Sequence, residues 1–169
     1  MSEVNPSLTV EDLLQVVELD DIVLLEVFAQ RSNKQLSTSK FSDLLGGDVD
    51  PEYELGCESE LSGRGFRVRL RVTIETEAGP VRVEVAAEYT LQESLFEEYQ
   101  PSVIREFAQF VGFFAVVPYA REAVASVTQR VFGAGLLMPI IKREEIELIQ
   151  ESAGDSEATP GDSITPEGD

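Results

Sequence analysis

The stretch that decides the fold alternates strictly between apolar and polar residues and reads Phe66-Arg67-Val68-Arg69-Leu70-Arg71-Val72-Thr73-Ile74-Glu75. A period of two is typical of a β-strand with one buried and one polar face. The segments on either side, residues 52–61 and 81–91, alternate in the same way. Short turns that contain glycine separate the three runs, at residues 62–65 and 78–79. The sequence therefore predicts three consecutive antiparallel strands.

Opposite charges on these strands predict a register. Glutamates and arginines share the polar face of neighbouring strands, and opposite charges that meet across a strand pair stabilise a sheet. The expected partners are Glu60–Arg67, Glu58–Arg69, Glu75–Arg82 and Arg69–Glu88. In this register the apolar residues meet on the other face of the sheet.

Before the three strands, the sequence predicts a short helix and a fourth strand. Thr9 is a helix cap followed by acidic residues, and helical spacing continues to about Glu18. Residues 21–30 are β-branched and apolar on both faces, so we expect both faces of this strand to be covered. Residues 31–51 then form a long polar connection, and loops of that length are usually functional.

After the strands, the apolar pattern becomes helical. A helix is expected to open at residue 101 and to end or kink at Pro118, because proline disrupts the helical hydrogen bonds. A second helix is expected over residues 119–132. An extended apolar segment, residues 136–141, follows, and residues 143–150 favour a last short helix.

These elements predict an α+β fold, an antiparallel four-stranded sheet with helices packed on one face. One domain is expected over residues 1–150. Residues 151–169 contain six acidic residues and no basic one, with few apolar side chains. We expect this acidic tail to be disordered because it cannot bury enough apolar surface to fold.

The charge and composition of the chain argue against several classes of protein. With 32 acidic and 13 basic residues its net charge is −19, which repels phosphate backbones and argues against nucleic-acid binding. The chain has no histidine, which excludes imidazole metal sites and the usual serine or cysteine triads. Its one cysteine, Cys57, cannot form an internal disulfide, which fits a reducing compartment. Cys57 lies on the apolar side of its strand, so we expect its thiol to be buried and inert.

No targeting or catalytic motif is evident in the sequence. The N-terminus has no basic start or apolar segment of a signal peptide, and the apolar run at residues 110–117 is shorter than the ~20 residues that span a bilayer. We therefore expect a cytoplasmic protein without direct membrane insertion. Nucleotide, calcium and zinc-protease motifs are missing, so we predict no catalytic residue, no metal and no cofactor.

The apolar residues exceed what one small sheet and its helices need. The excess lies in the two-faced strand and in residues 110–117 and 136–141. Apolar surface of this extent indicates a subunit interface, a groove for a partner, or both.

The sequence Val117-Pro118-Tyr119-Ala120-Arg121-Glu122 resembles a signature of the SecB family of protein-export chaperones, Pro-Tyr-Ala-Arg-Glu. The flanking segments agree: residues 107–116 lie where that family has its first long helix, and residues 68–74 resemble its third strand. The resemblance covers roughly residues 20–150. The family's Asn-Phe-Asp after the late proline is absent, and residues 140–143 read Ile-Ile-Lys-Arg, so the chain resembles diverged members such as those of toxin–antitoxin systems.

The resemblance implies a homo-oligomer, a dimer of dimers, that holds unfolded polypeptides in apolar grooves without ATP. Preproteins for Sec-dependent export are the expected clients. Acidic residues Asp21 and Glu84 match positions through which the family contacts the SecA motor. The residues assigned to client contact lie in the long connection and around the end of the second helix: Phe41, Leu44, Leu45, Tyr119, Val124, Val131, Phe132, Leu136 and Leu137.

Two alternatives stay open at this point. The chain could be a SecB-like chaperone dedicated to one antitoxin. In a different class, it could carry a small apolar ligand between the sheet and its helices. An enzyme that uses carboxylates alone ranks below both, because the motifs for catalysis are missing.

Overall fold

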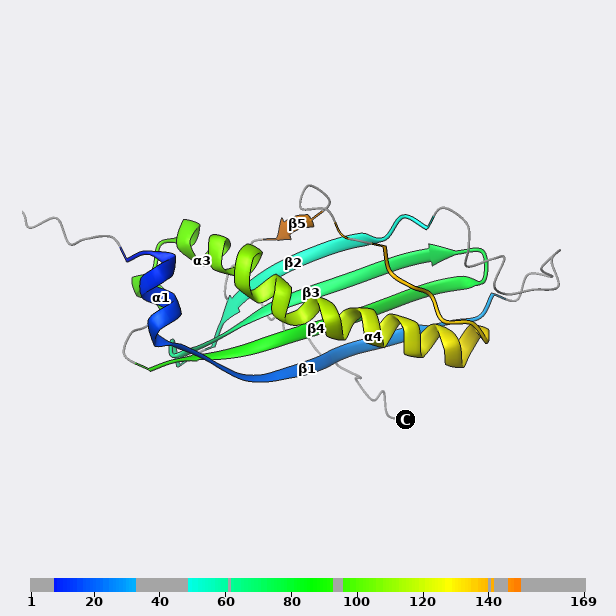
Figure 1. Cartoon of the computed structure of the whole chain (residues 1–169), viewed down its shortest axis with the longest axis horizontal. Coiled ribbons are helices and arrows are strands. Elements are labelled where there is room, and N and C mark those ends of the chain that lie inside the picture. The colour runs from blue at the N-terminus through cyan, green and yellow to red at the C-terminus, as the bar shows by residue number, and fades with distance from the viewer. Residues whose placement is uncertain are drawn as a thin grey trace, which may run out of the picture.

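A computed structural model describes residues 8–32, 49–60, 62–92, 96–139, 141 and 146–149. The predicted client residues Phe41, Leu44 and Leu45 and the acidic tail lie outside this part of the chain. The elements, in chain order, are α1 (Val10–Val16), β1 (Val17–Ala29), β2 (Glu52–Ser59), β3 (Gly65–Thr76), β4 (Gly79–Leu91), η1 (Phe96–Glu98), α3 (Pro101–Phe107), η2 (Ala108–Gly112), α4 (Phe113–Phe132) and β5 (Ile146–Ile149). Figure 1 shows a single sheet with the long helix lying across one of its faces.

The sheet has the strand order β1-β4-β3-β2-β5. Its first four strands are antiparallel, which confirms the predicted α+β fold with helices on one face. The short β5 pairs with β2 in parallel, so the helix expected over residues 143–150 is wrong at residues 146–149. These four residues include two β-branched isoleucines, and the open edge of β2 offers them a ladder that a one-turn helix cannot match.

Both expected hairpin registers are wrong by two residues. In the structure Glu58 lies opposite Arg67, and Arg71 lies opposite Glu84. Each turn lies one residue earlier in the chain than expected, because Gly65 and Gly79 begin their strands instead of completing the turns. Gly79 has φ 138°, which favours glycine, and a Cβ there would lie 1.9 Å from the carbonyl oxygen of Gln30. A shift of two leaves every side chain on its predicted face.

The helical segment is continuous from Pro101 to Phe132, through α3, the π-helical turn η2 and α4. Pro118 lies inside α4, so the helix does not end there, which was one of the two outcomes expected. Pro118 is exposed, and water can bind the carbonyl group that proline leaves without an intrahelical donor. Gly112 lets the helical segment approach the sheet closely, since a Cβ there would lie 2.7 Å from the Val68 side chain. Gly133, with φ 85°, ends the helix as expected.

By length and apolar content the helical segment Pro101–Phe132 is also a candidate membrane span. A helix that covers a sheet passes the same test, and α4 packs on β4, β3 and β1. Its buried residues, such as Val116, Ala120 and Val124, face this contact.

The core lies between the sheet and the helices. Alternate residues of β3 and β4 are fully buried, among them Val68, Leu70, Val72, Val83 and Val85. Beneath α3, the rings of Phe66, Tyr89 and Phe107 pack together with centroids 5.1–5.5 Å apart. These contacts hold the helices on one face of the sheet (Figure 1), and none of the described helices packs on the other face.

Candidate functional site

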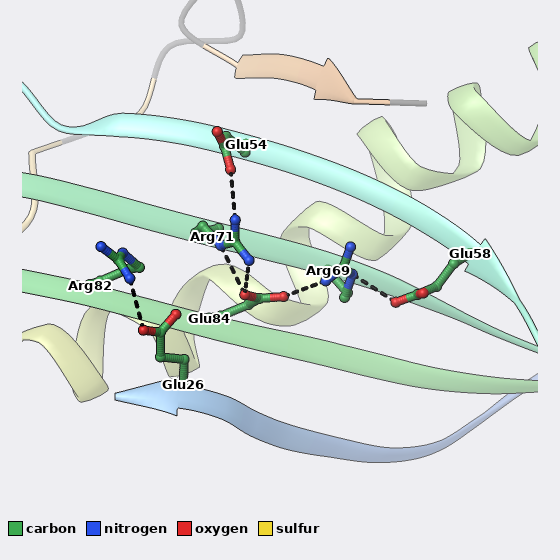
Figure 2. Close-up of polar contacts among 7 residues, drawn as sticks. All are labelled: Glu26, Glu54, Glu58, Arg69, Arg71, Arg82 and Glu84. Carbon is green, nitrogen blue, oxygen red and sulfur yellow. Dashed lines mark hydrogen bonds and ion pairs between the residues drawn. The ribbon is translucent and has the colours of Figure 1, made fainter. Parts of the chain in front are cut away.

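The face of the sheet away from the helices carries a ladder of ion pairs, shown in Figure 2. Glu84 of β4 lies at its centre, 2.6 Å from Arg69 and 2.7 Å from Arg71 across β3. Arg69 also lies 2.7 Å from Glu58, and Arg71 lies 3.5 Å from Glu54, both on β2. The ladder therefore ties three strands together through alternating charges.

Glu84, the central residue of the ladder, is almost completely buried. The residue is only 5% exposed. Arg71 donates to its carboxylate from both Nε and Nη2, and this bond is the main reason that the pKa of Arg71 is raised above its usual value. A carboxylate this buried requires such partners, since an unpaired buried charge is costly.

The two acidic residues assigned to a SecA-like partner therefore differ in access. Asp21 is exposed on β1, and its Oδ1 accepts the backbone N–H of Ile22 at 2.8 Å. Glu84 lies on the same face of the neighbouring strand, but its carboxylate is already held by two arginines. Asp21 offers a carboxylate to solvent, and Glu84 does not.

Large apolar side chains are exposed along the edge strand β1 and on the outer side of the helical segment. On β1 these are Leu19, Leu24, Leu25, Val27 and Phe28, which are 37–53% exposed. On the helical side they are Phe110, Phe114 and Tyr119, at 45%, 67% and 50%. The two-faced pattern of residues 21–30 was expected to mark a strand covered on both faces, but within one chain β1 is an edge strand with apolar residues in solvent.

The predicted client-contact residues that the structure describes fall into two groups. Tyr119 is half exposed and Leu137 is 85% exposed. Val124, Phe132 and Leu136 are buried in the core, at 0%, 2% and 6% exposure, and Val131 is partly buried against it. A helical stripe of apolar residues cannot by itself separate these roles, because core and contact residues look alike in sequence.

The exposed residues Phe110 and Phe114 and the apolar residues of β1 are missing from the predicted contact set. The sequence did indicate them as surplus apolar surface, at residues 110–117 and in the two-faced strand. Phe110 and Phe114 are exposed because another side of the helical segment packs on the sheet, the side that carries Gly112 beside Val68. The residues of β1 are exposed because that strand lies at the end of the strand order. The sequence pattern reveals neither fact.

The titratable groups within the core do not form a reactive centre. Burial raises the pKa of the Cys57 thiol to about 12, which keeps it protonated at neutral pH, although the side chain is partly exposed and not fully buried as expected. Burial also raises the pKa of Tyr89 to about 12. Among the described residues there is no group of three or more histidine, cysteine, aspartate or glutamate side chains that could hold a metal ion.

Comparison with known proteins identifies relatives of the chain. No family model matches it. The chain is 30% identical to the SecB-like chaperone SmegB of Mycolicibacterium smegmatis over 132 aligned residues. These residues cover 78% of each protein. Its structure is similar to that of the SecB-like chaperone Rv1957 of Mycobacterium tuberculosis, solved with a ChAD peptide from the HigA1 antitoxin, with a TM-score of 0.61 and 21% identity over 78% of this chain and 92% of that one. The fold, the Pro-Tyr-Ala-Arg-Glu sequence on α4 and this similarity together place the chain in the family of SecB-like chaperones.

Proposed function

We propose that this chaperone is an ATP-independent holdase that binds unfolded polypeptides in the cytoplasm and catalyses no reaction. The observation that carries the proposal is the exposure of large apolar side chains on a strongly acidic chain. Leu137, Phe114 and Leu24 are 85%, 67% and 53% exposed, and the net charge is −19. Apolar surface supplies affinity for unfolded chains, and the like charge keeps such a protein soluble.

The first experiment is light scattering with size exclusion, alone and with a chemically unfolded polypeptide, in the absence of nucleotide. We expect the protein to take up the polypeptide and to suppress its aggregation. A compact monomer that ignores the unfolded chain would overturn the proposal, because the exposed apolar residues would then have no client.

We further propose that the chain assembles as a dimer of dimers. Two separate apolar surfaces support this assembly: the strand β1, which lies at the edge of the sheet that the described strands form, and the outer side of η2 and α4 around Phe114. An unpaired strand edge is a template for a second strand, and two different self-complementary surfaces generate a closed tetramer.

Each proposed interface can be broken separately. Val27→Lys places a charge on the exposed edge strand, and Phe114→Glu places one on the helical surface. We expect a mass near four chains for the parent and near two chains for either variant. Glu97→Lys, at an exposed position on η1, is the control and should leave the mass unchanged. A parent that is monomeric at every concentration contradicts this assembly.

Two roles of this chaperone, protein export and protection of an antitoxin, differ in the class of client that it binds. The peptide in the Rv1957 complex comes from an antitoxin, which supports a dedicated antitoxin client for this chain as well. Preproteins and the SecA motor are the alternative, and exposed Asp21 is the residue that could reach such a partner. Purification from the native host should yield one dominant small client in the first case and a mixture of preproteins in the second. Asp21→Lys should weaken SecA binding in the second case and leave client holding intact, and unchanged SecA binding would remove Asp21 from this role.

A further inference from the structure

The segment after α4, residues 133–139, lies on the same side of the sheet as the helix; we name it the strap. After the turn at Gly133 the chain doubles back, and Figure 1 shows it crossing the sheet toward β2. Within the strap, Leu136 and Met138 are 6% and 8% exposed, whereas Leu137 between them is 85% exposed. The strap is thus an extended peptide that inserts every second side chain into the core.

Side chains of α4 hold the backbone of the strap. The N–H of Leu136 donates to Thr128 Oγ1 at 2.8 Å, and that hydroxyl donates to the Val124 carbonyl oxygen at 2.7 Å. At the far end, Arg121 donates to the carbonyl oxygen of Pro139 at 3.1 Å. The strap therefore runs antiparallel to α4, from Thr128 back to Arg121.

The strap belongs to no helix or strand, and its described contacts with α4 are of two kinds. Three hydrogen bonds to the side chains of Arg121, Thr128 and Gln129 fix its backbone, and two apolar side chains join the core. Each core strand, in contrast, is bound along its whole length to its neighbours. A segment with so few contacts is released at a lower free energy than the strands beside it.

These features match the chemistry of an unfolded client, which is an extended chain with apolar side chains and free backbone groups. We propose that the strap is an internal substitute for a client: the groove along α4 that Leu136 and Met138 fill is a client-binding groove, and an extended client segment with apolar residues two positions apart displaces the strap from it. This inference rests on the proposed holdase function and adds to it a site and a mode of regulation. It also gives Leu136 a different role from exposed Leu137, since Leu136 competes with the client instead of contacting it.

A disulfide can lock the strap on α4. A Cβ at Gly135 would lie 4.0 Å from the Cβ of Gln129, within the range that a disulfide requires. Gly135 is not among the described glycines with positive φ, so cysteine fits its backbone. Native Cys57 is a free thiol of intermediate burial, so the variants are compared on a Cys57→Val background. The test is the double variant Gln129→Cys with Gly135→Cys, and each single variant is a matched control.

The probe is a reduced and carboxymethylated polypeptide, which stays unfolded in both redox states. We expect the oxidised double variant to bind it at least tenfold more weakly than its own reduced form, and the reduced form to bind it as the Gln129→Cys single variant does, since both lack the bond from Gln129 to the Gly133 carbonyl oxygen. Each single variant should bind equally under both conditions. Equal binding by the oxidised and reduced double variant overturns the strap inference and leaves the holdase function standing. No binding by the parent overturns the holdase function itself.

Loosening the strap should have the opposite effect. Thr128→Val keeps the shape of the side chain but removes the hydroxyl that binds the Leu136 N–H, and one ordinary hydrogen bond corresponds to a factor of about five in an equilibrium. We expect client affinity to rise about fivefold, and hydrogen exchange at residues 136–138 of the parent to accelerate when the client saturates it. Slower exchange at these residues with client bound would mean that clients bind over the strap, and would overturn the inference.

Discussion

Strand β3 separates two surfaces of opposite chemistry within one stretch of chain. On the side toward α4, Val68, Leu70 and Val72 are fully buried. On the other side, Arg69 and Arg71 reach across to Glu84, which is 5% exposed. Apolar groups exclude water from the inner face, and on the outer face the paired charges shield Glu84 while the Arg71 side chain stays 42% exposed.

The two faces constrain the sheet in different ways. Apolar packing is non-directional and depends on volume, so it stabilises whichever strand arrangement fills the space. Ion pairs between guanidinium and carboxylate groups are directional, and they disfavour a shift of one residue, which would place charges opposite apolar groups. The inner face therefore contributes apolar burial, and the ladder contributes directional pairing between the strands.

The largest expected effect is on the inner face. Leu70 is fully buried in the centre of β3, so Leu70→Ala should lower the free energy of unfolding by about 2–5 kcal/mol. Urea denaturation followed by circular dichroism measures this loss. Thr73→Ala, on the other face of the same strand, should change stability by only about 0.5 kcal/mol. Equal losses in the two variants would contradict the assignment of the core to one face.

A smaller effect is expected at the centre of the ladder. Glu84→Gln keeps the shape of the side chain but removes the charge between two arginines, and we expect a loss of about 1–3 kcal/mol, since part of each arginine is open to water. The matched control is Glu26→Gln, which faces Arg82 at 3.1 Å in a pair that is more than a third exposed and should cost about 0–1 kcal/mol. If both changes cost the same, the ladder gains nothing from the burial of Glu84.

The sequence predicted the faces of the sheet better than the pairs. Alternation in residues 66–75 was enough to place every arginine on the outer face, and the four antiparallel strands are present. The predicted partners were wrong because charge pairing repeats every two residues, and several registers satisfy it equally. The geometry of the turns before Gly65 and Gly79 determines which of these registers forms. At Gly79 that geometry includes a positive φ.

The helical half of the chain was harder to predict for a similar reason. Pro118 favours a break, yet packing of the opposite side of α4 on the sheet outweighs one missing hydrogen bond. Residues 146–149 form a strand because they pair with the edge of β2. That edge comes from the tertiary fold, so the local sequence does not reveal it. Among the candidate contact residues, Val124 is buried and Leu137 is exposed. This difference depends on which side of each segment faces the sheet, and the sequence pattern does not show that side.

Alkaline pH should lower the stability of the folded chain through two titratable groups on the inner face of the sheet. Cys57 and Tyr89, on the inner face, have ordinary pKa values of 9.0 and 10.0, and both values rise to about 12 in the folded chain. Above pH 9 the unfolded chain releases these protons and the folded chain keeps them. Stability is therefore retained below pH 9 and lost as pH rises toward 12, by at most about 1.4 kcal/mol per pH unit for each group.

Urea denaturation at pH 8, 9 and 10 measures this slope. Cys57→Val removes the first group and should flatten the decline between pH 9 and 10 by about 1 kcal/mol. Arg71 of the ladder stays charged in this range, because its hydrogen bonds to Glu84 raise its pKa above the usual value. An identical pH dependence in Cys57→Val and the parent would place the alkaline loss elsewhere in the chain.

The smallest expected effect concerns the hydroxyl of Tyr89. The residue is 4% exposed, and among the described residues its hydroxyl has no hydrogen-bond partner, which is costly for a buried polar group. Tyr89→Phe keeps the ring in its contacts with Phe66 and Phe107, at 5.1 and 5.2 Å, and removes the hydroxyl. We expect a gain of about 0–1 kcal/mol, seen as a slightly higher melting temperature, together with loss of the tyrosine part of the alkaline slope. A clear loss of stability would mean that the hydroxyl is satisfied in the folded protein, and that the inner face, like the outer one, depends on a directional polar contact.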